Sequence, residues 1–378
     1  MRSSRKTPDP DPPKVLPMTT LPQPYINATA LSVTRKASPA GDPSSWIQLS
    51  ANESAFGASP LVREALAKAI QRPELYPEPS SAVLRQALSE TFGFSPDSLI
   101  CGNGSEAILE TIYRCYARGG DEVVFSRHSF IQFRIFADRV GAKAVLTEET
   151  AYHTDINAIL AAVTPRTKIV VVANPNNPTG TMLPATEIRR LRDALRPEIV
   201  LLLDSAYAEY VADPLYTAGH ELVEGTENVI VTRTFSKAFG LAGLRVAWAH
   251  GPRSMIATLN RMRQIGNVGT LAQAAAVAAL QDMEFMRNAV AETAELRAAL
   301  SRRLEELGFA SLPGHGNFLC AAFEDSRAAH AFLLARGIIV RPIEDYDLPD
   351  FLRITVGTAD QNAALVAALA EYAQATAA

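Results

Sequence analysis

The chain has little cysteine, no long apolar run and no excess of positive charge, and each absence excludes a class of protein. Its three cysteines, Cys101, Cys115 and Cys320, form an odd set without CxxC spacing, so they predict neither a disulfide framework nor a zinc site. No apolar stretch reaches the roughly 20 residues that a membrane-spanning helix needs. A net charge of -4 lacks the basic surplus that nucleic acid favours. We therefore expect no metal, no membrane contact and no nucleic acid.

The organisation of the chain indicates two domains, because 378 residues exceed one hydrophobic core. Residues 1–45 are rich in proline and lack an apolar signal region, which predicts a disordered or extended arm on a cytoplasmic protein. Beyond it, apolar runs such as Ile169–Val172 alternate with helical patterns, which is typical of a mostly parallel sheet covered on both faces. We expect a large α/β domain over 62–262 and a smaller α+β domain made of 46–61 and 263–378.

The segment from Arg233 to Arg245 has an unusual composition and follows a predicted strand, Val229–Val231. In it Lys237 stands among hydroxyl, glycine and apolar residues. A lysine in such surroundings can lose its proton and act as an amine nucleophile. Ser236 and Arg245 suit a phosphate group. The combination predicts a lysine that forms a Schiff base with pyridoxal phosphate (PLP), although a single lysine is more often a solvated surface residue.

Polar residues also follow three other predicted strands. They occupy Gly102–Glu106, Asn174–Gly180 and Asp204–Tyr207. In open α/β sheets, ligands bind at the carboxyl ends of the strands. Four loops that meet at one edge strengthen the assignment of Lys237 to a binding site.

Two of these loops match the ends of a PLP molecule. Backbone N–H groups of Gly104, Ser105 and Glu106 at a helix N-terminus can bind a phosphate. Asp204 can pair with the pyridine nitrogen and keep it protonated, which makes the ring a better electron sink. A structural cap at the end of a strand is the alternative role for Asp204.

Three further side chains match the ring of the cofactor. Asn177 and Tyr207 can form hydrogen bonds with the phenolic oxygen, and Phe130 can stack on the ring face. Taken singly, Phe130 also suits a hydrophobic core, and the Asn174–Gly180 segment also suits a simple turn. The predicted catalytic set is Lys237 with Asp204 and Tyr207.

A competing interpretation comes from Gly102–Ala107, which fits the G-x-G-x-x-A fingerprint of dinucleotide-binding proteins. That fingerprint calls for an acidic residue after the next strand, where Ser126 and Arg127 stand instead. It also leaves Lys237 without a role. An NAD(P)-dependent oxidoreductase is therefore the remote alternative.

With these residues assembled, the chain resembles the class I and II aminotransferases of PLP fold type I, and within them the histidinol-phosphate aminotransferase group. The resemblance covers residues 49–370. Its motifs are Asn52-Glu53, Tyr76-Pro77, Gly102–Ser105, Asn174–Gly180, Ser236-Lys237 with Arg245, and Leu352–Gly357.

The resemblance implies a role for each matching cofactor residue. Lys237 is the Schiff-base lysine and proton shuttle. The cofactor phosphate is held by Ser105, Glu106, Ser236 and Arg245. Tyr76 reaches the phosphate of a neighbouring subunit, which implies a homodimer with shared active sites.

The resemblance also implies a substrate side. Arg353 binds the substrate carboxylate or phosphate, a bidentate task that suits a guanidinium. Arg341 is either a second anion contact or a surface ion pair, and Asn52 and Phe56 line the pocket. The implied reaction is a ping-pong transfer of an amino group from histidinol phosphate, or an aromatic or other amino acid, to 2-oxoglutarate. A PLP decarboxylase of a phosphorylated amino acid shares these motifs and is the main alternative.

Three positions depart from the family pattern. Ser205 stands where relatives usually carry glutamate, and Phe130 lacks the hydroxyl of a frequent tyrosine. Gly266 stands where relatives usually have an aromatic residue that reaches the substrate of the neighbouring subunit. A vacated pocket at Gly266 admits other amino donors, so the donor is left open between histidinol phosphate and amino acids.

Overall fold

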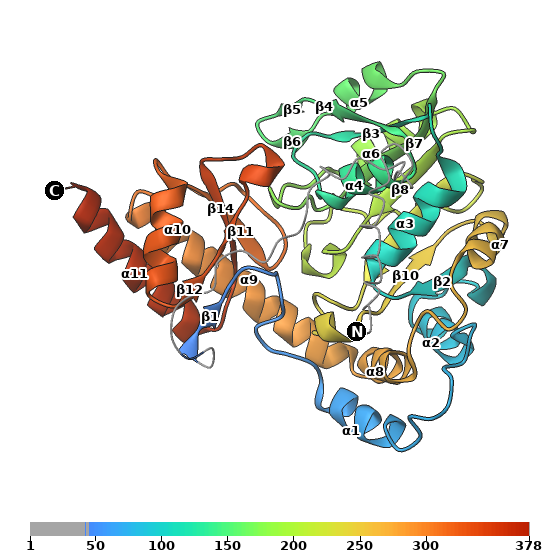
Figure 1. The fold of residues 1–378 in the computed structure, drawn as a ribbon, viewed down its shortest axis with the longest axis horizontal. Helices are drawn as coiled ribbons and strands as arrows, with labels where there is room; N and C mark the ends of the chain where they lie inside the picture. Colours follow the sequence, from blue (N-terminus) through green and yellow to red (C-terminus); the bar gives the residue numbers. More distant parts are fainter. Residues whose placement is uncertain (1–41, 43–44, 378) are drawn as a thin grey trace, which may run out of the picture.

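The computed structural model describes residue 42 and residues 45–377 of the chain. The arm expected over 1–45 lies outside the described residues except for Asp42 and Ser45. Figure 1 shows two lobes, with β2 to β10 in one and β11 to α11 in the other. No helix in the described part of the chain is long and apolar enough to cross a membrane.

A seven-stranded sheet forms the centre of the larger lobe. Its order is β2-β10-β9-β8-β7-β3-β4. Neighbouring strands run parallel from β9 to β4, whereas β10 is antiparallel to both of its neighbours. The strands are β2 (Leu99–Gly102), β3 (Glu122–Ser126), β4 (Lys143–Thr147), β7 (Thr167–Ala173), β8 (Val200–Asp204), β9 (Val229–Thr234) and β10 (Ala247–His250).

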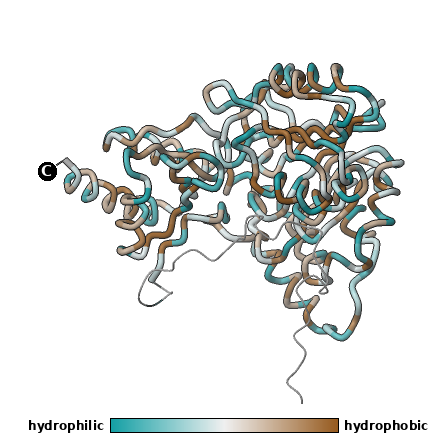
Figure 2. Tube along the Cα trace, turned by 45° about the horizontal axis from the view of Figure 1, so that its top comes forward, coloured by the Kyte–Doolittle hydropathy of each residue, from teal (hydrophilic) through white to brown (hydrophobic). Residues whose placement is uncertain are grey.

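Helices cover both faces of this sheet, which explains the uninterrupted apolar runs of its strands. In β7, Ile169 and Val171 pack on one face while Val170 and Val172 pack on the other. Figure 2 shows hydrophobic residues concentrated along these central strands. The covering helices on the first face are α3 (Ser105–Tyr116), α4 (Gln132–Arg139) and α7 (Arg253–Met262), and those on the second are α5 (Ile156–Ala162) and α6 (Ala185–Ala194). The expected fold class, a mostly parallel α/β domain of PLP fold type I with a smaller α+β domain, is confirmed.

The smaller lobe is built on a three-stranded antiparallel sheet of order β11-β14-β13. A short parallel pair, β1 with β12, ties the N-terminal segment to it. The elements of the lobe are β1 (Ile47–Gln48), β11 (Phe318–Ala322), α10 (Ser326–Ala335), β12 (Ile338–Ile339), β13 (Arg341–Pro342), η7 (Glu344–Tyr346), β14 (Phe351–Thr355) and α11 (Ala359–Ala377).

The junction between the lobes runs along one long helix, α9 (Met283–Glu306). Its residue Met286 packs with the core that lies over β2 and β10, whereas Leu300 and Leu304 pack in the core of the smaller lobe. That first core also contains α1 (Pro60–Ala69), α2 (Ala82–Phe92) and α8 (Thr270–Gln281). The domain bounds of 62–262 and 263–378 stay a prediction, and the packing of α8 favours a boundary inside α9.

Short strands and 3-10 turns complete the connections of the larger lobe. A hairpin of β5 (Glu149–Thr150) and β6 (His153–Thr154) follows β4. Single 3-10 turns lie at η3 (Pro96–Ser98), η4 (Ala208–Tyr210), η5 (His220–Leu222) and η6 (Ala242–Leu244). The turn η4 continues directly from the loop that follows β8, and η6 lies between Lys237 and Arg245.

Candidate active site

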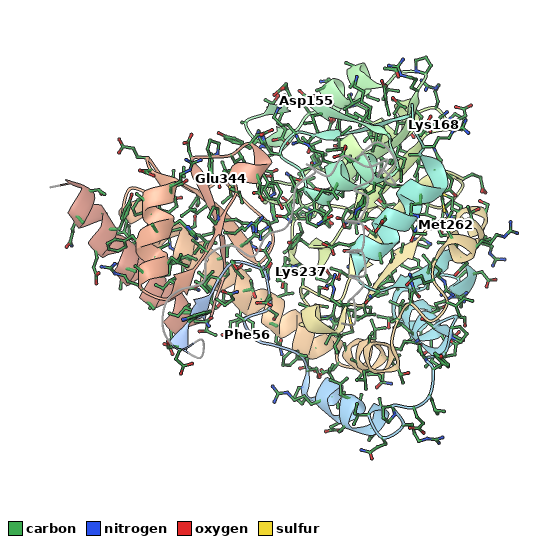
Figure 3. All side chains as sticks on the ribbon, viewed as in Figure 1. Phe56, Asp155, Lys168, Lys237, Met262 and Glu344 are labelled. Carbon is green, nitrogen blue, oxygen red and sulfur yellow. The ribbon has the colours of Figure 1, made fainter. Side chains whose placement is uncertain are left out.

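A pocket lies at the carboxyl ends of β2, β3, β7, β8 and β9. It brings together Ser105, Glu106, Phe130, Asn177, Asp204, Tyr207, Ser236, Lys237 and Arg245. The loops from four strands meet because β2 and β9 both run antiparallel to β10 and so share a direction. The predicted meeting of the four loops at one sheet edge is therefore what the structure shows, and Figure 3 places Lys237 between the two lobes.

Lys237 lies after the end of β9 with its amine turned toward the N-terminal segment. Its Nζ donates hydrogen bonds to the backbone oxygens of Ala51 at 3.1 Å and Asn52 at 3.2 Å. Burial lowers the pKa of Lys237 from 10.5 to about 8, and the nearby Arg353 adds to this shift. A lower pKa leaves more of the amine neutral near physiological pH, which is the reactive form of a lysine nucleophile.

Asp204 ends β8 on the floor of the pocket. It is only 5% exposed, and the Thr232 hydroxyl donates a hydrogen bond of 3.0 Å to its Oδ1. Burial raises the pKa of Asp204 from 3.8 to about 6. A buried carboxylate of this kind gains from a cationic partner, which a protonated ring nitrogen supplies.

The predicted phosphate site lies between the N-terminus of α3 and Arg245. Gly104 adopts a φ of +80°, which favours glycine, and a Cβ at this position would lie 2.4 Å from Arg245 Nη2, so a larger residue would displace the guanidinium from its present position. Arg245 Nη1 donates to Ser236 Oγ at 3.4 Å, and Nη2 lies 3.5 Å from Glu106 Oε2. Ser105 is the first residue of α3, whose N-terminal N–H groups receive no side-chain cap from Gly104. These donors together suit an anion.

Tyr207 and Phe130 border the middle of the pocket. The Tyr207 hydroxyl accepts a hydrogen bond of 2.8 Å from Asn52 Nδ2, and burial raises the pKa of Tyr207 to about 12. Phe130 packs edge to face on Phe133, with 5.7 Å between the ring centroids. Phe130 is therefore both a pocket residue and a part of the core that lies beneath it.

Arg353 carries a buried positive charge without an acidic partner in the described part of the chain. It is 7% exposed and donates to Asn177 Oδ1 at 2.6 Å and to the backbone oxygen of Ser50 at 2.8 Å. Its Nε has no hydrogen-bond partner among the described residues. Because an uncompensated buried charge is costly, this guanidinium favours an incoming anion.

Arg353 and the remaining predicted residues lie outside the pocket lining. Asn52 is buried and reaches the site through Tyr207, whereas Phe56 is half-buried on the N-terminal segment. Arg341 forms an ion pair of 2.7 Å with Asp345, and Tyr76 is 99% exposed. Whether Tyr76, Phe56 and Arg341 contact cofactor or substrate stays a prediction.

The sequence reasoning missed some residues that line the pocket. They are Ala173, Pro175, Ala206 and Thr234. Three of them lie inside the predicted segments Asn174–Gly180, Asp204–Tyr207 and Arg233–Arg245, and Ala173 ends β7 directly before the first of these, so only their positions at the strand ends could have signalled them. Thr234 also accepts a hydrogen bond from the backbone N–H of Ser236 at 3.0 Å, which helps to fix the loop before Lys237.

The residues of this pocket fit PLP in their chemistry. The glycine cradle at Gly104 and the donors of Ser236 and Arg245 match a phosphate, while Asp204 matches a pyridine nitrogen. Lys237 supplies an amine with a lowered pKa. No cluster of metal-ligating side chains occurs in the part of the chain that the structure describes.

The sequence profile of aminotransferase class I and II matches residues 44–369. The chain belongs to this family. It is an aminotransferase that uses PLP. The alternative of an NAD(P)-dependent oxidoreductase therefore falls away, and Gly102–Ala107 is the strand-to-helix turn of an aminotransferase.

Curated relatives show which group within the family this chain resembles. The chain is 43% identical over 318 residues to the histidinol-phosphate aminotransferase of Granulibacter bethesdensis, covering 83% of this chain and 86% of that protein. It is 44% identical over 331 residues to the enzyme of the same name from Paramagnetospirillum magneticum, covering 86% and 91%. The expected resemblance to the histidinol-phosphate aminotransferase group is thus confirmed.

Solved structures show the same likeness. The histidinol-phosphate aminotransferase of Sinorhizobium meliloti, in complex with pyridoxal-5'-phosphate, matches with a TM-score of 0.82 and 30% identity. The match covers 87% of this chain and 91% of that chain. An aspartate aminotransferase from Thermus thermophilus matches with a TM-score of 0.78 and 25% identity, covering 87% and 91%. The shared fold thus extends across aminotransferases with different named substrates.

Proposed function

We propose that this aminotransferase moves an amino group from histidinol phosphate, or from an aromatic or other amino acid, to 2-oxoglutarate by a ping-pong mechanism. The observation that carries the proposal is the buried guanidinium of Arg353, which has no acidic partner among the described residues and donates to Asn177 in the lining of the Lys237 pocket. Both the donor and the acceptor of such a reaction carry an anionic group, and one arginine can bind each of them in turn. The names of the curated relatives support histidinol phosphate as one donor to test.

The pocket residues divide the work of holding the cofactor. Ser105, Ser236 and Arg245 would hold its phosphate, and Asp204 would pair with its ring nitrogen. When bound, PLP supplies an aldehyde that condenses with amines and a ring that takes up the electron pair left when the substrate α-carbon loses its proton.

Lys237 moves the proton in this reaction. Its lowered pKa makes the neutral amine available, so with PLP bound Lys237 would take the proton from the substrate α-carbon, hold it, and return it at C4′. Arg353 orients the substrate by its anionic group so that the α-proton faces Lys237. Asn177 holds Arg353 in place through the hydrogen bond of 2.6 Å.

We also propose a homodimer in which Tyr76 completes the phosphate site of the partner subunit. Tyr76 is 99% exposed, and exposed apolar residues lie near it in sequence at Ile70 and Leu75. Ile265 is 90% exposed, and Gly266 adjoins Pro77, because a Cβ on Gly266 would lie 3.2 Å from Pro77 Cγ. A surface with this many exposed apolar residues favours a protein partner.

A donor screen tests the proposal. The holoprotein is mixed with histidinol phosphate, phenylalanine, tyrosine or histidine, and the visible cofactor band is followed before and after addition of 2-oxoglutarate. We expect at least one donor to bleach the band, and 2-oxoglutarate to restore it with release of glutamate. Carbon dioxide release without need for a 2-oxo acid would identify a decarboxylase instead. A band that responds to no donor would contradict the proposal.

A further inference from the structure

Thr355 joins strand β14 of the smaller lobe to Asn52 through two hydrogen bonds. Its Oγ1 accepts a hydrogen bond of 2.9 Å from the backbone N–H of Asn52 and donates one of 3.2 Å to Asn52 Oδ1. Both residues are buried, with exposed fractions of 4% and 1%. A hydroxyl has one hydrogen to donate, and here it goes to the oxygen of the Asn52 amide.

The Asn52 amide therefore turns its nitrogen toward Tyr207. Asn52 Nδ2 donates a hydrogen bond of 2.8 Å to the Tyr207 hydroxyl. In the opposite orientation of the amide, Oδ1 would face Tyr207 and could only accept the hydrogen of that hydroxyl. Thr355 thus determines whether Tyr207 accepts or donates in its contact with Asn52.

A Tyr207 hydroxyl that accepts from Asn52 keeps its own hydrogen for another partner. The side chain of Tyr207 lines the pocket, and Lys237 Nζ lies 5.9 Å from the centre of its ring. Burial raises the pKa of Tyr207 to about 12, so the hydroxyl retains its hydrogen at neutral pH. This hydrogen suits an acceptor inside the pocket, and the phenolic oxygen of PLP is such an acceptor.

We propose that Thr355 is a positioning residue, which acts through Asn52 to make Tyr207 a hydrogen-bond donor to the phenolic oxygen of the cofactor. The inference rests on the proposed function, in which Lys237 is the Schiff-base lysine. Once the Schiff base loses its proton, the phenolic oxygen no longer shares that proton and carries a full negative charge. A donor at this oxygen favours the charged form, so the Tyr207 hydroxyl lowers the pKa of the Schiff base.

A second amide beside the pocket is oriented by the same strand. Arg353 Nη1 donates a hydrogen bond of 2.6 Å to Asn177 Oδ1, which leaves the Nδ2 group of Asn177 for another acceptor. Asn177 lines the same pocket as Tyr207. Arg353 and Thr355 are two positions apart in β14, so their side chains leave the strand on the same side. Strand β14 thus orients two amides, and both arrangements leave a hydrogen-bond donor for the cofactor.

A purely structural role for Thr355 makes a different prediction. Without the Thr355 hydroxyl, the buried N–H of Asn52 loses its acceptor, which costs stability whether or not the cofactor is bound. If that were the only effect, the melting temperature of the cofactor-free protein would fall and the pKa of the Schiff base would keep its wild-type value. The pKa of the Schiff base therefore separates the two roles.

The test titrates the visible band of the PLP-loaded protein without any substrate. The band moves when the Schiff base loses its proton, so spectra between about pH 5 and pH 10 give its pKa. We expect Thr355→Val to raise this pKa by at least about half a pH unit, because the freed amide of Asn52 can take the Tyr207 hydrogen. Tyr207→Phe should raise it at least as much. Thr355→Ser keeps the hydroxyl and should stay within about 0.2 pH units of the wild type.

Two further variants keep the test decisive. Thr293→Val is the matched control, because Thr293 is also buried and its hydroxyl donates to the backbone oxygen of Ala289 within α9. It should leave the pKa of the Schiff base unchanged. In a Tyr207→Phe background, Thr355→Val should have no further effect on this pKa, because Thr355 acts through Tyr207. If Thr355→Val does not fold, Thr355→Ala replaces it.

Three results overturn the inference. They are an unchanged pKa in Thr355→Val, an equal rise in Thr293→Val, and a rise of the same size when Thr355→Val is made in the Tyr207→Phe background. The proposed function fails in a different way, as a wild-type band that no amino donor bleaches, and no donor is present in this titration.

Discussion

Asn177 and Arg353 stand 176 positions apart, yet Arg353 Nη1 donates a hydrogen bond of 2.6 Å to Asn177 Oδ1. Asn177 belongs to the loop after β7 in the larger lobe, and Arg353 belongs to β14 in the smaller lobe. This hydrogen bond holds the guanidinium of Arg353 beside Asn177, which lines the pocket. The position of Arg353, the proposed contact of the substrate anion, relative to Lys237 therefore depends on how the two lobes pack together.

Arg353→Lys should lower kcat/KM for every donor by at least about 100-fold. An ammonium can keep the charge, but it cannot donate to Asn177, to Ser50 and to a carboxylate in the same plane. Steady-state kinetics with saturating 2-oxoglutarate measure the loss. Arg336→Lys is the control, because Arg336 forms an exposed ion pair with Glu371 and should tolerate the change. Near-normal kcat/KM in Arg353→Lys would exclude the proposed anion contact.

Lys237→Ala should slow the half-reaction at least about 10³-fold while PLP still binds noncovalently. The variant loses the amine that attacks the cofactor and moves the α-proton, but it keeps the phosphate site at Ser236 and Arg245. Absorbance titration measures binding, and stopped-flow absorbance measures the half-reaction. Lys168→Ala serves as the control, because Lys168 lies far from Lys237 (Figure 3). Turnover retained in Lys237→Ala would rule out the mechanism.

Asp204→Asn should stabilise the cofactor-free protein at neutral pH and inactivate the enzyme. The pKa of Asp204 is raised by burial from 3.8 to about 6, so the folded state holds this proton more tightly than the unfolded state does. Stability therefore falls as pH rises between about 4 and 6, and above that range the ionised carboxylate costs up to about 3 kcal/mol. An amide avoids this cost and can still accept the hydrogen bond from Thr232.

Urea unfolding of the wild type and of Asp204→Asn, both without PLP, measures the direction of this change in stability. We expect Asp204→Asn to be more stable than the wild type at pH 7.5 and nearly equal to it at pH 4. Activity should fall at least about 100-fold, because no carboxylate keeps the ring nitrogen protonated. A variant that is less stable than the wild type at both pH values would show that the carboxylate is not a source of strain.

Tyr76→Ala and Lys237→Ala should complement each other if active sites are shared between subunits. Tyr76→Ala alone should bind PLP at least about tenfold more weakly, because the phosphate loses a hydroxyl donor. Mixed dimers of the two variants contain one site with both native residues. At a limiting PLP concentration, refolding the two together should therefore give more activity than the sum of the two variants refolded separately. A monomeric protein, or mixtures without recovered activity, would contradict the shared site.

The chemistry of the pocket was predictable because parallel strands end at one edge. From runs such as Val229–Val231 and the loops after them, the sequence predicts that Asp204, Asn177 and Lys237 lie close together. All three line the same pocket. The direction of β10 was not predictable, since an apolar run such as Val246–Ala249 has no signal for parallel or antiparallel pairing. The fold could be inferred from periodicity, whereas strand direction depends on long-range pairing.

Contacts between the lobes could not be predicted from the sequence either. The hydrogen bond from Asn52 to Tyr207 joins residues 155 positions apart, and local patterns say nothing about such pairs. The ion pair of Arg341 with Asp345 is different, because its spacing of four residues is visible in the chain. The role of Arg341 was left open between an anion contact and an ion pair, and the structure contains the ion pair.

The hydrogen bonds from Lys237 to Ala51 and Asn52 exist only while its amine is free. Asn52 is held in turn by the smaller lobe, through Thr355 and through the side chain of Asn317. An amine condensed with PLP would keep at most one N–H, so it could no longer donate to both carbonyls, and this link between Lys237 and the segment held by the smaller lobe would be weaker in the loaded enzyme.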